Sequence, residues 1–367
     1  MHRKRHFLLS FTLILVAAVA VRADDIDDYV KTVMQSQHIP AVSIAVIKNG
    51  SLIKAEGYGL ANLEYGITAR PDTVFKIGSV SKQFIATGIM LLVQDGRVAL
   101  DDKLSKYLEG TPSTWQAITL RHLLTHTSGL VREGPGFNPY KLQPDFDVIK
   151  TAYPLPLNFK PGEKYEYCNV GYFILAEVIH KVSGKPWGDF LTERVFVPLG
   201  MTATRVTSVA DIVPNRADGY AWNAGKFQNT ENWPAVRPSG AFLSTVLDLA
   251  KWEAALLTDQ VLKGSNKTEM WTQVVLNDGR KYPYGFGWQL NDWPADSPTP
   301  TGVPMIRHGG SMPGFRAGYF RWPSHGLAVV VLTNREGANI DGLGASIAIR
   351  VVPELKQVSS QAAPAPR

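Results

Sequence analysis

The chain has 367 residues, of which 45% are hydrophobic and 19% are charged, and this composition excludes collagen, coiled coils and intrinsic disorder. The net charge of +6 includes four basic residues and no acidic one within residues 1–23, so the remainder carries only +2. A nearly neutral chain gives no electrostatic support for binding nucleic acid. The single cysteine, Cys168, excludes an intrachain disulfide and any zinc site built from several cysteines.

The N-terminus has the pattern of a secretory signal peptide. A basic stretch at 2–6 precedes an apolar run at 7–21 that is short for a membrane span, and small residues stand at Val21 and Ala23. This pattern predicts cleavage after Ala23 and a periplasmic or secreted protein with no stable membrane insertion. The alternative is an uncleaved N-terminal anchor.

The first half of the remaining chain predicts two helices and a hairpin. A helix is expected over about 25–36, and the β-branched residues of 41–59 surround Asn49-Gly50, a strong hairpin turn signal. Residues 82–93 are apolar almost all round, which predicts a buried helix. The proline- and glycine-rich segment 131–165 has no clean period and is expected to be irregular and functional or mobile.

The second half predicts further helices before two terminal strands. Helices are expected over about 172–183 and 244–257, a second irregular segment over 219–237, strands over 317–322 and 327–333, and a last helix over 340–352. Strands therefore lie near both chain ends. We expect a mixed α/β fold (α+β) in which an antiparallel sheet from both ends carries flanking helices and an inserted all-helical domain. The predicted division is 24–80 with 238–356 for the sheet domain, 81–237 for the mainly helical domain, and a disordered tail at 357–367.

Two Ser-x-x-Lys patterns occur in the chain. A serine hydroxyl needs a nearby base to act as a nucleophile, and a lysine three residues later can supply it on a helix, where both side chains share a face. Ser51 and Lys54 lie in a predicted strand, where positions i and i+3 point to opposite faces. Ser79 and Lys82 instead begin the buried helix, so we expect only this second pair to be catalytic.

Two further motifs follow in order. Tyr167-Cys168-Asn169 is the only Tyr-x-Asn sequence, and His308-Gly309-Gly310 follows near the C-terminus. With the flanking stretches FKIGSVSK (75–82), LLTHTSGL (123–130), PGEKYEYCNVGY (161–172), YGFGW (284–288) and HGGSMPGF (308–315), the chain resembles the class C β-lactamase-like serine hydrolase family, whose members include D,D-peptidases, D-aminopeptidases and family VIII esterases. The resemblance covers roughly residues 30–350 and implies a β-lactamase/transpeptidase-like fold.

The resemblance also implies roles for the motif residues. Ser79 would be the acylated nucleophile, and Lys82 and Tyr167 would carry its proton, with either as the general base. Asn169 would hold Lys82 and the substrate, and the third motif, His308, Gly309 and Gly310, would bind substrate. The backbone N–H groups of Ser79 and Ser311 would form the oxyanion hole. No metal and no cofactor is implied.

The resemblance leaves the substrate open among small esters, peptides and β-lactams. In the third motif, β-lactamases usually have Lys and Thr where this chain has His308 and Gly309, so recognition of a β-lactam carboxylate is weakened. We therefore expect a serine hydrolase of the carboxylesterase or D-amino-acid peptidase type, acting as a monomer. The alternatives are a true class C-like β-lactamase and a non-hydrolytic penicillin-binding or sensor protein.

Other features of the sequence allow either a structural or a functional interpretation. Cys168 stands where the family usually has Ser or Ala, and we interpret it as a packing residue. His122 and His126 have the spacing of zinc ligands on a helix, but no Glu follows the first histidine, so a structural role is favoured. The aromatic residues Trp222, Phe227 and Trp233 could belong to the core or to a pocket wall.

Overall fold

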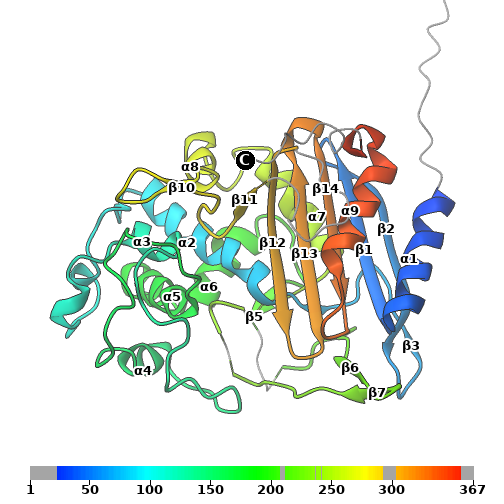
Figure 1. Cartoon of the computed structure of the whole chain (residues 1–367), viewed down its shortest axis with the longest axis horizontal. Helices are drawn as coiled ribbons and strands as arrows, with labels where there is room; N and C mark the ends of the chain where they lie inside the picture. Colours follow the sequence, from blue (N-terminus) through cyan, green and yellow to red (C-terminus); the bar gives the residue numbers. More distant parts are fainter. Residues whose placement is uncertain (1–22, 207–210, 236, 241, 292–302, 357–367) are drawn as a thin grey trace, which may run out of the picture.

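The computed structural model describes residues 23–206, 211–235, 237–240, 242–291 and 303–356 (Figure 1). The predicted signal peptide and the predicted tail at 357–367 lie outside these residues, apart from Ala23, and stay predictions. Within the described ranges, no helix is both long enough and apolar enough to cross a membrane.

A seven-stranded antiparallel sheet brings the two ends of the chain together, as the sequence predicts (Figure 1). Strand β1 pairs with β14 on one side, where Val42 lies opposite Thr333, and with β2 on the other. The hairpin predicted around Asn49-Gly50 is confirmed. In spatial order the strands are β11 (Gln289–Asn291), β12 (Met305–Met312), β13 (Phe315–Trp322), β14 (Leu327–Thr333), β1 (Ala41–Lys48), β2 (Ser51–Asn62) and β3 (Ile67–Thr68).

Helices cover both faces of this sheet, which explains why β1 is mostly apolar and buried over nearly its whole length. Helices α1 (Ala23–Gln37) and α9 (Ile340–Val351) pack on one face, and α7 (Val246–Leu256) packs on the other (Figure 1). Successive side chains of a strand point to opposite faces. Val42 and Ile44 accordingly join the cluster under α1 and α9, and Ala45 and Ile47 join the larger core on the other side.

The middle of the chain forms a helical region beside the sheet. Its centre is α2 (Lys82–Gln94), which packs against α5 (Asn169–Ser183) and α6 (Trp187–Leu191) and is buried over nearly its whole length. The region also contains α3 (Leu120–Leu124), α4 (Asp145–Lys150), α8 (Gly264–Met270), two 3₁₀ turns (Leu104–Lys106 and Ser113–Trp115) and a π-helical turn (Thr192–Phe196). Short strands complete the region: β4 (Phe75–Lys76), β8 (Phe242–Ser244) and β5 (Arg205–Val206) in one sheet, and β9 (Val274–Val275) with β10 (Lys281–Tyr282) in another.

Several predicted boundaries differ from the structure for local reasons. Helix α5 begins at Asn169 and not at 172, because the Cys168 sulfur accepts the Gly171 N–H and caps the helix. The segment 219–237 is not fully irregular: β6 (Tyr220–Asn223) and β7 (Lys226–Asn229) form a hairpin. Each strand is four residues long and lacks the alternation of apolar and polar residues that would predict it. The proposed division into a sheet domain and a helical domain stays a prediction.

Candidate active site

Ser79 and Lys82 lie on one helical turn at the start of the buried helix α2. Residues Gly78–Ser81 form a 3₁₀ turn that continues directly into α2, so the two side chains meet on one face. Lys82 is fully buried, and its Nζ lies 3.2 Å from Ser79 Oγ, 2.8 Å from Asn169 Oδ1 and 2.7 Å from the backbone oxygen of Ser239. The structure therefore brings together residues of the first and second sequence motifs.

The surroundings of Lys82 favour its neutral form. Burial lowers the pKa of Lys82 well below its usual value, and the positive charge of Arg237 lowers it further. The carboxylate of Glu133 opposes this shift. A buried ammonium loses its hydration and gains no direct ion pair here, since its three partners are an amide, a hydroxyl and a carbonyl.

Tyr167 lies against the same lysine. Its ring centroid is 4.7 Å from Lys82 Nζ, and its hydroxyl is hydrogen-bonded with Ser79. Burial raises the pKa of Tyr167 well above its usual value, although the hydrogen bond with Ser79 and the charge of Arg132 act in the opposite direction. The phenol is therefore protonated at neutral pH.

A charged pair that the motifs do not contain holds Asn169. The Asn169 Nδ2 group donates to Glu133 Oε1, and Glu133 Oε2 accepts a hydrogen bond from Arg237 at 2.7 Å. Because Nδ2 faces Glu133, the amide oxygen of Asn169 is turned toward Lys82. Sequence reasoning missed Glu133 and Arg237, since both lie in the segments predicted to be irregular.

The third motif places its backbone beside Ser79. Strand β12 packs on the 3₁₀ turn of Ser79, and a side chain at Gly310 would collide with the carbonyl oxygen of Ile77. Gly78 has φ of +53°, and a Cβ there would lie 2.5 Å from the nitrogen of Ser311. Glycine is thus required at both positions for Ser79 and Ser311 to lie close together.

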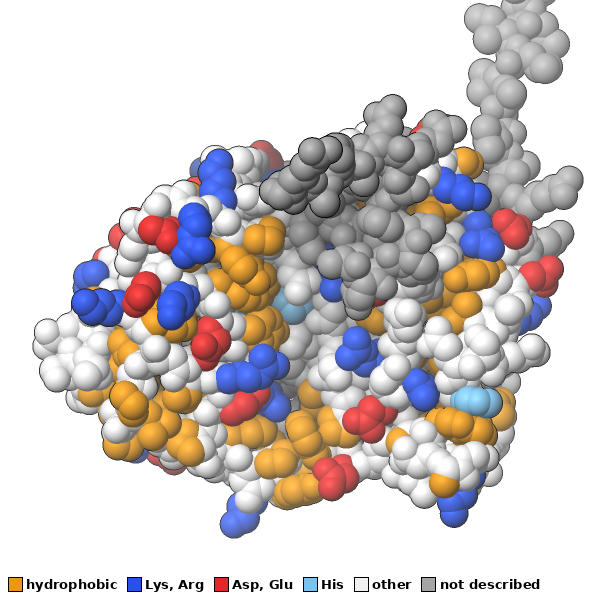
Figure 2. Space-filling model, in the orientation of Figure 1, with side chains coloured by type: hydrophobic (Ala, Val, Ile, Leu, Met, Phe, Trp, Pro, Cys, Tyr) orange, Lys and Arg blue, Asp and Glu red, His pale blue; other side chains and the backbone are white. Residues whose placement is uncertain are grey.

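These residues surround a cavity of about 590 Å³. The surface is hollowed between the helical region and the sheet, and basic side chains lie around the hollow (Figure 2). Side chains from both irregular segments and from β12 form its walls. The cavity is lined by Ser79, Arg132, Glu133, Tyr167, Asn169, Ala221, Asn223, Gln228, Asn229, Thr230, Glu231, Trp233, Arg237, Ser311, Met312, Pro313 and Glu336.

His308, in contrast, points into the protein. It is 2% exposed, its Nδ1 lies 2.7 Å from the oxygen of Gly309, and its Nε2 lies 3.0 Å from the Tyr284 hydroxyl. The same hydroxyl lies 3.1 Å from Nε2 of His126, whose Nδ1 is 3.1 Å from the N–H of Cys168. Both imidazole nitrogens of His308 therefore already have protein partners, and its predicted contact with substrate stays a prediction.

The partners in this chain fix where each proton lies. The Cys168 N–H can only donate, so neutral His126 carries its proton on Nε2 and donates it to Tyr284. The Gly309 oxygen can only accept, so neutral His308 carries its proton on Nδ1 and accepts from Tyr284 at Nε2. Burial, reinforced by the charge of Lys82, lowers the pKa of His308 to about 3 and that of His126 well below its usual value. Both histidines are thus neutral near pH 7.

Because these two histidines are buried and neutral, we expect the protein to lose stability in acid. The unfolded chain binds protons on His308 at its ordinary pKa near 6.5, whereas the folded chain does so only near 3. Between these values the unfolded state holds more protons, so the free energy of unfolding falls as the pH drops, by about 4 kcal/mol at pH 3 from His308 alone. Urea unfolding at pH 7, 6, 5 and 4 measures this slope. A His308→Asn variant should show a shallower slope below pH 6.5, and an identical slope would contradict the prediction.

Cys168 has a structural place. The residue is buried, its sulfur caps α5, and its thiol donates to the oxygen of Val131. Burial raises the pKa of Cys168 to about 12, so the nucleophilic thiolate is absent at neutral pH. These contacts agree with its interpretation as a packing residue.

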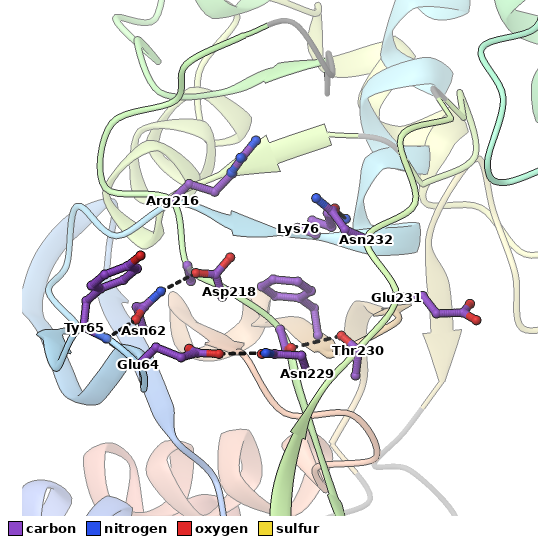
Figure 3. A pocket seen from close by; sticks show the side chains of 13 residues that line it. Asn62, Glu64, Tyr65, Lys76, Arg216, Asp218, Asn229, Thr230, Glu231 and Asn232 are labelled. Atoms are coloured by element: carbon purple, nitrogen blue, oxygen red, sulfur yellow. Dashed lines mark hydrogen bonds between the residues drawn. The ribbon is translucent and has the colours of Figure 1, made fainter.

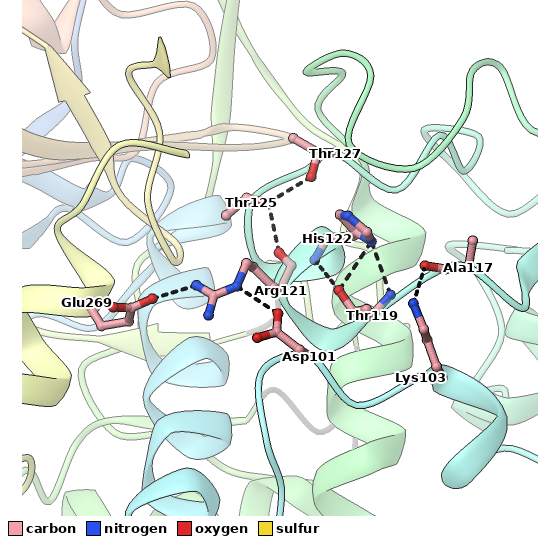
Figure 4. Close-up of polar contacts among 9 residues, drawn as sticks. All are labelled: Asp101, Lys103, Ala117, Thr119, Arg121, His122, Thr125, Thr127 and Glu269. Carbon is pink, nitrogen blue, oxygen red and sulfur yellow. Dashed lines mark hydrogen bonds and ion pairs between the residues drawn. The ribbon is translucent and has the colours of Figure 1, made fainter. Parts of the chain in front are cut away.

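His122 and His126 do not face one another. Helix α3 ends at Leu124, and His126 adopts φ of +58°, which turns its ring away from the helical register. His122 instead closes a capping box with Thr119 at the start of α3, beside the ion pairs of Arg121 with Asp101 and Glu269 (Figure 4). Among the residues that the structure describes, no group of three His, Cys, Asp or Glu side chains could hold a metal ion.

The aromatic residues Trp222, Phe227 and Trp233 lie in two different places. Trp233 lines the active-site cavity, and its ring lies 6.0 Å from the Arg237 guanidinium. Trp222 stacks on His38 with ring centroids 4.0 Å apart and contacts the exposed Phe227. Only one of the three therefore belongs to the active-site wall.

A second cavity of about 340 Å³ lies beside the first and shares Asn229, Thr230 and Glu231 with it (Figure 3). Lys76, three residues before Ser79, is buried there and donates to Asn232 Oδ1 at 2.7 Å. Burial, with the nearby charge of Arg216, lowers the pKa of Lys76 to about 8. This lysine belongs to the second cavity and does not line the cavity of Ser79.

Known proteins resemble the chain over most of its length. It is 30% identical over 317 residues to penicillin-binding protein 4* of Bacillus subtilis (strain 168). The matched region covers 78% of this chain and 68% of the relative. The curated relatives compared are longer, and the chain covers 61–68% of their lengths.

Solved structures share the fold. The octameric penicillin-binding protein homologue from Pyrococcus abyssi has a TM-score of 0.79 and 25% identity, covering 92% of this chain and 79% of that one. The D-amino acid amidase from Ochrobactrum anthropi SV3, complexed with L-phenylalanine amide, has a TM-score of 0.75 and 25% identity. The match covers 90% of this chain and 98% of the amidase chain. Since the first of these is octameric, the monomeric state expected here stays a prediction. Residues 26–353 match the family model described as beta-lactamase, and the chain belongs to the beta-lactamase family.

Proposed function

We propose that the chain is a serine hydrolase that cleaves an ester or amide bond through an acyl-enzyme on Ser79. The observation that carries this proposal is the buried Lys82 amine beside the Ser79 hydroxyl, 3.2 Å away. A neutral amine has two hydrogens and one lone pair. Asn169 Oδ1 and the Ser239 oxygen accept the two hydrogens, which leaves the lone pair for the Ser79 proton.

Acylation then follows from these positions. The Ser79 oxygen attacks the substrate carbonyl carbon while its proton passes to Lys82 Nζ, which becomes an ammonium. The carbonyl π electrons move to the oxygen, which the backbone N–H groups of Ser79 and Ser311 would stabilise. The raised pKa of Tyr167 makes a phenolate base unfavourable, so we assign the role of general base to Lys82.

Tyr167 is the proposed proton donor to the leaving group. Its hydroxyl contacts Ser79 and its ring lies against Lys82, so it can pass a proton to the departing oxygen or nitrogen and regain one from Lys82. Collapse of the intermediate breaks the bond to the leaving group and leaves an ester on Ser79. Water then hydrolyses this ester with Lys82 again accepting a proton.

A hydrolysis panel on the chain from residue 24 onward tests the proposal. We expect turnover of p-nitrophenyl butyrate or of a D-alanyl amide, with a cephalosporin hydrolysed at lower kcat/KM. The reason is that the third motif offers a neutral His308 and no lysine, and one lost charge-assisted hydrogen bond costs about 1.5–3 kcal/mol, or roughly ten- to a hundredfold. A cephalosporin turned over faster than the ester would contradict this and favour the β-lactamase alternative.

A fluorescent acyl-serine probe separates the enzyme from the sensor alternative. Labelling of Ser79 followed by release of the label indicates a hydrolase. Stable labelling without turnover of any panel substrate would favour a penicillin-binding or sensor protein. The predicted signal peptide supports the further proposal that these reactions take place in the periplasm or outside the cell.

A further inference from the structure

We infer that the second cavity, beside that of Ser79, binds a small zwitterion, a molecule that carries one carboxylate and one ammonium group. The inference goes beyond the proposed function and does not rest on it, because Ser79 does not line this cavity. The cavity has a volume of about 340 Å³, and residues of 62–65, 216–219 and 229–232 meet around it with Lys76 and Phe315 (Figure 3). Two cations and two carboxylates among these residues carry the inference.

Lys76 is a buried cation that no carboxylate of the described residues contacts. It is 7% exposed, its Nζ donates to Asn232 Oδ1 at 2.7 Å, and the same atom lies 5.8 Å from the Phe315 ring centroid. An ammonium has three hydrogens, and within the described ranges the Asn232 oxygen is its only hydrogen-bond acceptor. With a pKa of about 8, the amine is mostly protonated at pH 7. Burial of a charge is costly unless an opposite charge compensates it, so a carboxylate in the cavity would stabilise Lys76.

Arg216 supplies a second cation to the cavity. Its backbone is held beside the segment that leads to Lys76, because it forms a parallel β-bridge with Val74. Its side chain is exposed and has no ion-pair partner among the residues that the structure describes. The charge of Arg216 lowers the pKa of Lys76, so the two cations are close enough to repel each other. A carboxylate has two oxygens, and one placed between the two cations would interact with both.

Two carboxylates, those of Glu64 and Asp218, lie below the two cations in Figure 3. Glu64 accepts hydrogen bonds from the Tyr220 hydroxyl and from Asn229 Nδ2, both at 2.7 Å. Asp218 accepts a hydrogen bond from Asn62 Nδ2 at 2.5 Å. All of these donors are neutral, so they orient the two carboxylates without cancelling their charge. An ammonium group is therefore attracted to this side of the cavity.

This arrangement of charges favours a zwitterion over a simple ion. A simple anion held by the two cations would be repelled by the two carboxylates, and a simple cation held by the carboxylates would be repelled by the cations. A molecule with both charges is complementary to both sides at once. The third acid of the lining, Glu231, accepts a hydrogen bond from Trp233 Nε1 at 3.0 Å and belongs to the wall that the two cavities share.

The experiment measures binding of three probes to the Ser79→Ala protein by calorimetry. Glycylglycine carries both charges, N-acetylglycylglycine keeps only the carboxylate, and glycylglycinamide keeps only the ammonium. We expect glycylglycine to bind, and each blocked probe to bind about 10- to 100-fold more weakly, because it loses one charge-assisted contact. Lys76→Met and Arg216→Gln should each weaken the binding of glycylglycine by a similar factor. Glu64→Gln should weaken the binding of glycylglycine but not that of N-acetylglycylglycine, which has no ammonium.

Arg132→Gln is the matched control, because it removes an exposed cation that lines the cavity of Ser79 and not the second cavity. It should leave the affinity for glycylglycine unchanged. Loss of binding in Arg132→Gln but not in Lys76→Met or Arg216→Gln would overturn the inference, since the probe would then occupy the cavity of Ser79. A blocked probe that bound as tightly as glycylglycine, or no binding of glycylglycine at about 10 mM, would overturn it too. None of these measurements involves hydrolysis, so the proposed function is tested separately.

Discussion

Ser79→Ala should reduce hydrolysis of every substrate to the uncatalysed background while leaving the fold intact. The change removes only an oxygen from a partly buried turn. Among the described residues, Ser79 has the serine hydroxyl within hydrogen-bonding distance of Lys82 Nζ, and Ser239 contacts that amine through its backbone oxygen. The residual rate on p-nitrophenyl butyrate, together with an unchanged thermal midpoint, measures the effect. Intact-mass analysis should show the acyl adduct in the unmodified enzyme and none in Ser79→Ala.

The chain provides its own control for this prediction. Ser51 and Lys54 repeat the Ser-x-x-Lys spacing in strand β2, but Lys54 pairs with Asp27 at 2.5 Å and has no contact with Ser51. Ser51→Ala should therefore keep full activity. Loss of activity in Ser51→Ala but not in Ser79→Ala would show that the nucleophile has been assigned to the wrong motif.

Tyr167→Phe should lower kcat by a factor that depends on the leaving group. A lost proton-transfer group usually costs about 10²- to 10⁴-fold, and we expect this range for amides and alkyl esters, whose leaving groups must be protonated. A p-nitrophenyl ester should lose much less, because p-nitrophenolate departs without a proton. Steady-state rates on the two substrate types in both enzymes measure this contrast.

A buried tyrosine outside the site serves as the control. Tyr319 is fully buried and its hydroxyl donates to Glu253 at 2.8 Å, so Tyr319→Phe should affect stability but not the contrast between leaving groups. Equal losses on amide and p-nitrophenyl ester in Tyr167→Phe would refute a role in leaving-group protonation. They would point instead to activation of Ser79 and so to the alternative in which Tyr167 is the base.

Local sequence patterns were sufficient where a structure depends on neighbouring residues. The Asn49-Gly50 turn, the buried helix α2 and the Ser79–Lys82 spacing are each encoded within a few residues. The same reasoning separated the two Ser-x-x-Lys copies, because strand and helix geometry differ at i+3. The order of the three motifs, compared with a known family, also indicated the fold, which the seven-stranded sheet confirms.

Local patterns failed where a contact depends on residues far apart in the chain. His126 leaves the helical register at φ of +58°, which its spacing from His122 in the sequence does not show. Its hydrogen bond to Tyr284 joins residues 158 positions apart, and Tyr284 in turn is hydrogen-bonded to His308, 24 positions further along the chain. Together these contacts hold His308 as a buried neutral group.

By itself, therefore, the sequence determined the secondary structure around the motifs, the family resemblance and the identity of the candidate nucleophile, since these depend on short spacings and on motif order. The tertiary structure alone decided the electrostatics of the site. Whether Arg237 is neutralised by Glu133 while Arg132 has no such partner depends on which loops meet across the cavity. Burial and charge pairing, which set the protonation of Lys82 and His308, are properties of the packed protein and not of any single segment.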